Sequence, residues 1–179
     1  TDGNALTHMI NQTMMRVELP TAMKTGDTFS FNIKWWYQIN NHVTDGGLSG
    51  YELFPDGNRN YVIAQFYPRM AVYNDVEGWQ NSQFWGRHEF ALPFGNFEVN
   101  ITVPADHLLD GTGKLMNRED LFSSDMMKRY EKAKKSYDEP VVISTQDEAE
   151  AREKGRSKKK NTWTLYAENV RDFRFATSR

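Results

Sequence analysis

The stretch Phe-Ser-Phe-Asn-Ile-Lys-Trp-Trp-Tyr at residues 29–37 is the longest in the chain in which apolar and polar residues alternate. A second such stretch, Phe-Glu-Val-Asn-Ile-Thr-Val at residues 97–103, stops at a proline. Alternation with a period of two places successive side chains on opposite faces of a β-strand, so both stretches predict strands. In the first, Trp35 and Tyr37 are expected on the core face and Trp36 on the other face.

Shorter patterns on both sides extend this β-rich prediction. Further strands are predicted at residues 13–19, 61–64, 70–73, 141–144, 163–167 and 170–175. Between residues 118 and 160 the apolar residues change to helical spacing, and Thr145 to Glu148 forms a capping box that opens a second helix. We therefore expect two helices inserted between the strands of a mostly antiparallel sheet, after a polar and frayed segment at residues 1–12.

Size and composition restrict the classes of function. The 179 residues correspond to one domain of ordinary size, and they contain no cysteine, which excludes thiolate catalysis and cysteine-type zinc sites. The 22 basic and 24 acidic residues give a net charge of −2, which argues against a nucleic-acid partner. No apolar run approaches the roughly 20 residues of a membrane helix, so no membrane segment is expected. The chain begins without a methionine, and we interpret it as a fragment of a larger protein.

No catalytic motif is complete. A zinc-hydrolase helix needs a second histidine four residues after the His-Glu pair, and the position four residues after His88 is Leu92. No Gly-x-Ser-x-Gly turn and no glycine-rich phosphate loop occur either. The remaining histidines stand alone, and each is expected to be an ordinary surface or loop residue: His8, His42 and His107. The sequence therefore predicts no catalytic residue, no metal ligand and no cofactor in this chain.

The order of residues in three segments is more specific than composition alone. Residues 61–79 read Tyr-Val-Ile-Ala-Gln-Phe-Tyr-Pro-Arg-Met-Ala-Val-Tyr-Asn-Asp-Val-Glu-Gly-Trp, and residues 94–107 read Phe-Gly-Asn-Phe-Glu-Val-Asn-Ile-Thr-Val-Pro-Ala-Asp-His. Both resemble the N-terminal, non-catalytic domain of the aminopeptidase N family of zinc metallopeptidases, in a bacterial branch. Residues 167–173, Ala-Glu-Asn-Val-Arg-Asp-Phe, are similar to the strand that leads into the catalytic domain of that family.

This resemblance implies a fold and a function. The fold is an antiparallel β-sandwich or saddle-like domain over residues 13–179, with the helical insertion at 118–160. The domain packs on the catalytic domain of the same chain and forms one wall of the cleft that holds the peptide N-terminus. Zinc belongs to the catalytic domain of the parent aminopeptidase, so the fragment alone is expected not to be an enzyme. The resemblance also implies that the parent is exported to the periplasm or outer surface of a Gram-negative bacterium.

Two substrate-binding positions follow from the resemblance. In the family, a strand lends the cleft a Gln and, two residues on, a Gln or Glu, which hold the free amino end and first side chain of the peptide. Gln65 matches the first position, where its amide oxygen can accept a hydrogen bond from an ammonium group. Tyr67 occupies the second position and departs from the pattern, because it has no carboxylate. The alternative is a purely structural role, in which Gln65 makes a local hydrogen bond and the Tyr67 ring packs within the domain.

Two other classes of function stay open. A free-standing carbohydrate-binding β-sandwich would use the aromatic rings of Trp36, Trp79 and Trp85. An interaction or structural domain would bind no small ligand. For the Trp35-Trp36-Tyr37 cluster, packing in a core and against a neighbouring domain is favoured over a sugar platform.

Overall fold

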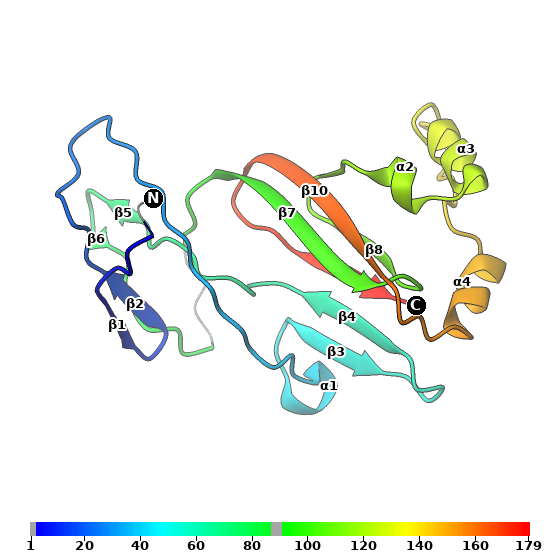
Figure 1. Ribbon diagram of the computed structural model, residues 1–179, viewed down its shortest axis with the longest axis horizontal. Coiled ribbons are helices and arrows are strands. Elements are labelled where there is room, and N and C mark those ends of the chain that lie inside the picture. The colour runs from blue at the N-terminus through cyan, green and yellow to red at the C-terminus, as the bar shows by residue number, and fades with distance from the viewer. Residues whose placement is uncertain (1–2, 87–90) are drawn as a thin grey trace. The chain divides into compact units, whose positions relative to one another are not determined.

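The structure is a computed structural model that describes residues 3–86 and 91–179, and it is mainly β (Figure 1). All pairings between the strands of its sheets are antiparallel, as predicted. The chain divides into two compact units, where the sequence predicted one domain over 13–179. Unit 1 comprises Thr1–Tyr37 and Tyr67–Pro93, and unit 2 comprises Gln38–Phe66 and Phe94–Arg179.

Unit 1 contains two small two-stranded sheets. Their strands are β1 (His8–Asn11), β2 (Met14–Val17), β5 (Tyr73–Asn74) and β6 (Gly78–Trp79). The β1–β2 hairpin turns at Gln12, whose φ is 52°, and β1 lies inside the segment that was expected to be frayed. The amide of Gln83 ties the hairpin to the second part of the unit, since its Oε1 accepts from Thr13 N at 2.9 Å.

The strand predicted at residues 29–37 is wrong, because this stretch forms no strand in the structure. Trp36 is 90% exposed, and Trp35 and Tyr37 are each about half exposed rather than on a core face. Alternation supplies only the side-chain pattern, whereas a strand also needs a neighbour for its N–H and C=O groups. Among the described residues, no strand pairs with this stretch.

Unit 2 holds the two larger sheets. The four-stranded sheet has the order β3-β4-β11-β8, and the three-stranded sheet has the order β7-β10-β9. Their strands are β3 (Gly50–Leu53), β4 (Arg59–Ile63), β7 (Gly95–Pro104), β8 (Leu108–Gly111), β9 (Lys114–Leu115), β10 (Lys160–Val170) and β11 (Phe175–Ser178), and the short helix α1 (His42–Asp45) precedes β3. The strand predicted at 97–103 is confirmed as β7, which runs beside β10 in Figure 1.

The core of unit 2 comes from alternate residues of these strands. On β10 the inward-facing side chains are Trp163, Leu165 and Ala167, and all three are buried. Phe173 follows β10, is 0% exposed and lies with its ring centroid 6.1 Å from that of Phe97. Three short connections lead from one sheet directly to the other: β7 to β8, β8 to β9, and β10 to β11.

Three helices follow β9 and gather at one end of unit 2 in Figure 1. They are α2 (Arg118–Leu121), α3 (Ser124–Ala133) and α4 (Gln146–Glu153). The predicted capping box is confirmed, since Glu148 N donates to Thr145 Oγ1 at 3.3 Å and Thr145 N donates to Glu148 Oε2 at 2.8 Å. The strand predicted at 141–144 is wrong. In its place the carbonyl of Ile143 accepts a hydrogen bond from Arg129 Nε at 2.7 Å, and Arg129 also pairs with Glu148.

Candidate functional site

Gln65 lies just beyond the end of β4 and is exposed. Its neighbours hold it on both sides: Ala64 N donates to Ser49 Oγ at 3.0 Å, and the Phe66 ring packs edge-on against Phe175 at 5.5 Å between centroids. Between these anchors Gln65 adopts a φ of 52°, in the left-handed region that residues other than glycine rarely enter. Such a conformation costs about 1–3 kcal/mol and is concentrated at functional positions. The strand end therefore presents the Gln65 amide to solvent in a fixed, strained backbone.

Tyr67 is half-buried and belongs to unit 1, whereas Gln65 belongs to unit 2. The guanidinium carbon of Arg69 lies 5.5 Å from the centroid of the Tyr67 ring, which places a cation over its face. The ring is thus already engaged by a neighbouring residue of its own unit. The two predicted substrate-binding residues therefore belong to different units, Gln65 to unit 2 and Tyr67 to unit 1.

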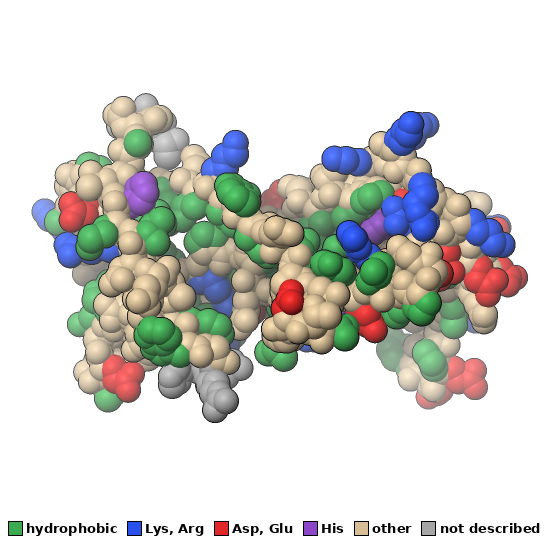
Figure 2. Space-filling model, turned by 90° about the horizontal axis from the view of Figure 1, so that it is seen from below, with side chains coloured by type: hydrophobic (Ala, Val, Ile, Leu, Met, Phe, Trp, Pro, Cys, Tyr) green, Lys and Arg blue, Asp and Glu red, His purple; other side chains and the backbone are tan. Residues whose placement is uncertain are grey.

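The tryptophans of the carbohydrate alternative all lie in unit 1 and are exposed. Trp36 is 90%, Trp85 68% and Trp79 57% exposed. Trp79 packs edge-on against Tyr73, with 5.3 Å between ring centroids. Figure 2 shows that exposed hydrophobic side chains are interspersed with polar atoms across the viewed face.

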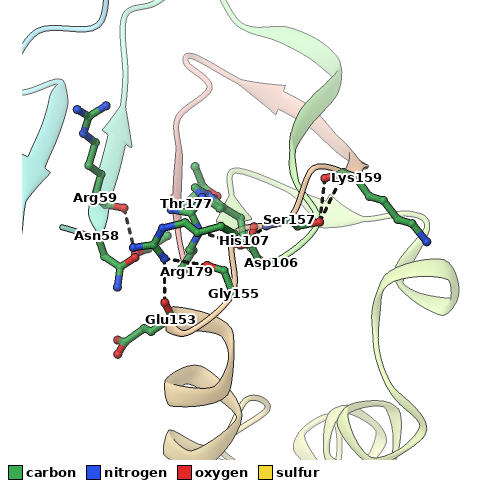
Figure 3. A network of polar contacts seen from close by, with 12 residues as sticks. Asn58, Arg59, Asp106, His107, Glu153, Gly155, Ser157, Lys159, Thr177 and Arg179 are labelled. Atoms are coloured by element: carbon green, nitrogen blue, oxygen red, sulfur yellow. Dashed lines mark hydrogen bonds and ion pairs between the residues drawn. The ribbon is translucent and has the colours of Figure 1, made fainter. Parts of the chain in front are cut away.

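A buried polar cluster in unit 2 was missed by sequence reasoning (Figure 3). His107 was expected to be a surface or loop residue, and this is wrong, because it is only 5% exposed. Its Nδ1 lies 3.1 Å from Thr177 Oγ1, and the Thr177 hydroxyl donates to the carbonyl of Leu108 at 2.7 Å. Since a hydroxyl has a single hydrogen, Nδ1 must carry the proton and donate to Thr177, which leaves the lone pair on Nε2.

Burial and the neighbouring charges together determine the protonation of His107. Burial lowers the pKa of His107 below its ordinary value of 6.5, the positive charge of Arg179 lowers it further, and the carboxylate of Asp106 offsets part of this effect. Burial alone raises the pKa of Asp106, but hydrogen bonds from Ser157 N at 2.9 Å and Arg179 Nε at 2.8 Å outweigh it and bring the net pKa below 3.8. The cluster therefore contains a neutral imidazole and a charged carboxylate.

The hydrogen bonds of this cluster connect separate segments of unit 2. The Asp106 carboxylate joins the end of β7 to the turn at Ser157, and His107 joins the start of β8 to β11. The Thr177 hydroxyl is committed to a backbone carbonyl, so it cannot act as a nucleophile activated by His107. The sequence carried only a weak signal for this role, a histidine directly after Val-Pro-Ala-Asp at a strand boundary.

Within residues 3–86 and 91–179, no three His, Asp or Glu side chains lie close enough together to hold a metal ion. The His88-Glu89 pair lies outside the described residues. In that described part of the chain, no helix combines the length and apolar character needed to cross a bilayer. No family model matches the chain, and neither a curated protein nor a solved structure matches it.

Proposed function

We propose that this chain is the non-catalytic N-terminal domain of a zinc aminopeptidase, and that it forms one wall of the cleft in which the parent enzyme holds a peptide N-terminus. The observation that carries the proposal is Gln65, an exposed amide held in a left-handed backbone at the end of β4. It lies within residues 61–79, one of the three segments that resemble the aminopeptidase N family. The other two resembling segments coincide with β7 and with the end of β10, so the matching residues lie on and beside core strands.

In this proposal Gln65 has a single role, which is to accept a hydrogen bond from the substrate. A peptide N-terminus is an ammonium group, and the amide oxygen of Gln65 accepts one of its hydrogen bonds. The φ of 52° sets the direction in which the exposed side chain of Gln65 leaves the backbone. Zinc and its ligands come from the catalytic domain of the same chain.

The proposal includes two statements at the level of the whole enzyme. The two sheets of unit 2 are arranged as an antiparallel β-sandwich or saddle that packs on the catalytic domain. The parent enzyme is exported to the periplasm or outer surface of a Gram-negative bacterium. Both rest on the family resemblance.

The test uses the complete enzyme and the variant Gln65→Ala. A hydrogen bond to a charged group contributes about 1.5–3 kcal/mol, so kcat/KM for an aminoacyl p-nitroanilide is expected to fall roughly 10- to 100-fold. Gln146→Ala is the matched control, because Gln146 lies exposed on α4 and bonds only Glu150 within that helix. Equal kcat/KM in Gln65→Ala and wild type would contradict the role of Gln65.

A carbohydrate-binding module is the second candidate, favoured by the exposure of Trp36, Trp79 and Trp85. Sugar rings stack on exposed aromatic faces, so this function predicts binding on a glycan array that each Trp→Ala substitution weakens. Binding that survives all three substitutions, or no binding at all, would exclude it.

A further inference from the structure

The segment between the end of α4 and the first residue of β10 carries a concentrated positive charge. Residues 154–160 read Lys-Gly-Arg-Ser-Lys-Lys-Lys, without an acidic residue, and we call them the basic turn. The overall net charge of the protein is −2, so this turn is electrostatically unlike the rest of the chain. Its five cationic side chains are all exposed: Lys154, Arg156, Lys158, Lys159 and Lys160.

Hydrogen bonds hold the backbone of the basic turn against the strands of unit 2. Ser157 N donates to the carboxylate of Asp106 at 2.9 Å, and Ala105 N donates to the carbonyl of Lys159 at 2.9 Å. Within the turn, Lys159 N donates to Ser157 Oγ at 3.1 Å. In Figure 3 the side chain of Lys159 points away from this network. The backbone of the turn is therefore fixed, whereas its charged side chains extend into solvent.

The lysines of the basic turn keep their charge available. Within residues 3–86 and 91–179, no ion pair involves Lys154 or any of the three lysines at 158–160. Arg156 is oriented by its own segment, because its Nη1 donates to the carbonyls of Glu153 and Gly155 at 2.9 and 2.8 Å. The turn is thus a source of positive charge for a partner outside the chain.

An exposed apolar tip lies near the basic turn, at the β3–β4 hairpin. We call residues 53–57, Leu-Phe-Pro-Asp-Gly, the hairpin tip, which is closed by a hydrogen bond from Gly57 N to the carbonyl of Phe54 at 2.9 Å. Leu53 is 52% and Phe54 39% exposed. Hydrogen bonds from Asn58 lower the pKa of Asp56 in this tip, and the charge of Arg156 lowers it further. The field of the basic turn therefore reaches the hairpin tip.

The combination of cations and apolar side chains selects the kind of partner. A nucleic acid and an acidic protein would each attract the lysines by charge alone. An anionic bilayer attracts them in the same way, and its interface also takes up exposed apolar side chains. The bilayer is therefore the partner that uses both the basic turn and the hairpin tip.

We propose that the basic turn and the hairpin tip bind the surface of an anionic phospholipid bilayer. The lysines lie close to the lipid phosphates, and Leu53 and Phe54 enter the interface between headgroups and acyl chains. This inference does not depend on Gln65 and goes beyond the proposed role in the peptide cleft. It gives a function to a run of charges that the cleft does not use.

Sedimentation of the 179-residue chain with lipid vesicles tests the proposal. The two probes are vesicles of phosphatidylcholine alone and vesicles of phosphatidylcholine mixed with phosphatidylglycerol, which is anionic. The chain should sediment with the mixed vesicles and not with the neutral ones. Raising the ionic strength from about 0.1 M to about 1 M shortens the Debye length from about 10 Å to about 3 Å, so it should release most of the bound chain.

Two triple variants with the same change in charge locate the surface. Lys158→Gln, Lys159→Gln and Lys160→Gln combined should weaken binding to the mixed vesicles on the order of 100-fold, at roughly fivefold for each lysine near the lipid. The matched control combines Lys128→Gln, Lys132→Gln and Lys135→Gln, three exposed lysines on or just after α3. The control should change binding by less than about fivefold, because charges beyond a Debye length are screened. All six side chains are exposed, so both variants should melt like wild type.

Phe54→Ala tests the hairpin tip, and it should weaken binding to the mixed vesicles about tenfold because an apolar side chain leaves the interface. A DNA duplex and poly-glutamate, tested beside the vesicles, represent the other anionic partners. Binding to either of them without binding to the mixed vesicles would overturn the proposal. So would equal binding to neutral and mixed vesicles, equal losses in the two triple variants, or wild-type binding by Phe54→Ala.

Discussion

Lowering the pH from 7.5 to 5.5 should destabilise unit 2 through His107. The folded state holds this imidazole neutral, with Nδ1–H donated to Thr177, and burial and Arg179 lower its pKa below 6.5. The groups that face it are Arg179, the carboxylate of Asp106 and the ring of Tyr61, whose centroid lies 6.3 Å from that of the imidazole.

The sign follows from proton linkage. The unfolded chain takes up a proton near the ordinary pKa of 6.5, and the folded chain resists it, so below that pH the unfolded state binds more protons. The stability that His107 contributes is thus fully present above pH 6.5 and is lost as the pH falls toward the lowered pKa of the folded state. While folded His107 stays neutral, the loss at pH 5.5 amounts to about 1.4 kcal/mol. This is a sizeable part of the roughly 5–15 kcal/mol that holds a domain folded.

Urea unfolding at a series of pH values measures this effect, with hydrogen exchange of the β10 and β11 amides as the probe of unit 2. His107→Asn keeps an N–H donor near the Nδ1 position but cannot be protonated, so its stability should change less between pH 7.5 and 5.5. His8→Gln, a change at an exposed histidine of unit 1, should keep the wild-type slope. A wild-type stability that is flat or rises as the pH falls from 7.5 to 5.5, or an identical slope in His107→Asn, would show that the folded state does not hold His107 neutral.

Three further predictions concern single side chains. Phe173→Ala should destabilise unit 2 by about 3–5 kcal/mol in urea, because it empties a fully buried position, while Phe94→Ala at an exposed ring should cost far less; equal losses would contradict the assigned core. Thr145→Ala should cost about 0.5–2 kcal/mol by breaking the capping box, seen as faster hydrogen exchange in α4, and unchanged exchange there would count against it. Gln65→Gly should leave the melting temperature unchanged or raised, because relief of the strained φ offsets the greater freedom of glycine in the unfolded chain. The same variant should lower kcat/KM of the complete enzyme as Gln65→Ala does. A clear loss of stability would show that the φ of Gln65 stores no strain.

Local patterns in the sequence predicted the elements that local forces determine. The alternation at 97–103 became β7, and the Trp163 to Ala167 alternation became the buried face of β10. The capping box at Thr145 formed as expected, because both of its hydrogen bonds connect residues three positions apart. In these segments the fold supplies the hydrogen-bond partners that the side-chain pattern requires.

The failures share one physical cause, which is that pairing partners are not encoded in a local pattern. Residues 29–37 have the alternation of a strand, but no strand within residues 3–86 and 91–179 pairs with them. In residues 141–144, the carbonyl of Ile143 accepts from Arg129 instead of from a neighbouring strand. Unpaired backbone groups favour whichever partner the fold brings near, so β propensity alone did not determine either segment.

The polar sites depend on contacts between distant residues. His107 meets Thr177 across 70 positions, and Asp106 meets Ser157 across 51. A single sequence marks such residues only by type, so their burial and the direction of their pKa shifts appeared only with the fold.

The most direct test of the central claim compares the complete reading frame that contains this chain with the 179 residues alone, in an assay of alanyl p-nitroanilide hydrolysis. We predict that the complete protein releases p-nitroaniline, that a zinc chelator abolishes the release and added zinc restores it, and that the isolated chain is inactive under all of these conditions. Chelator-sensitive turnover by the isolated chain, or a folded complete protein without aminopeptidase activity, would contradict the proposal that this chain is the non-catalytic domain of a zinc aminopeptidase.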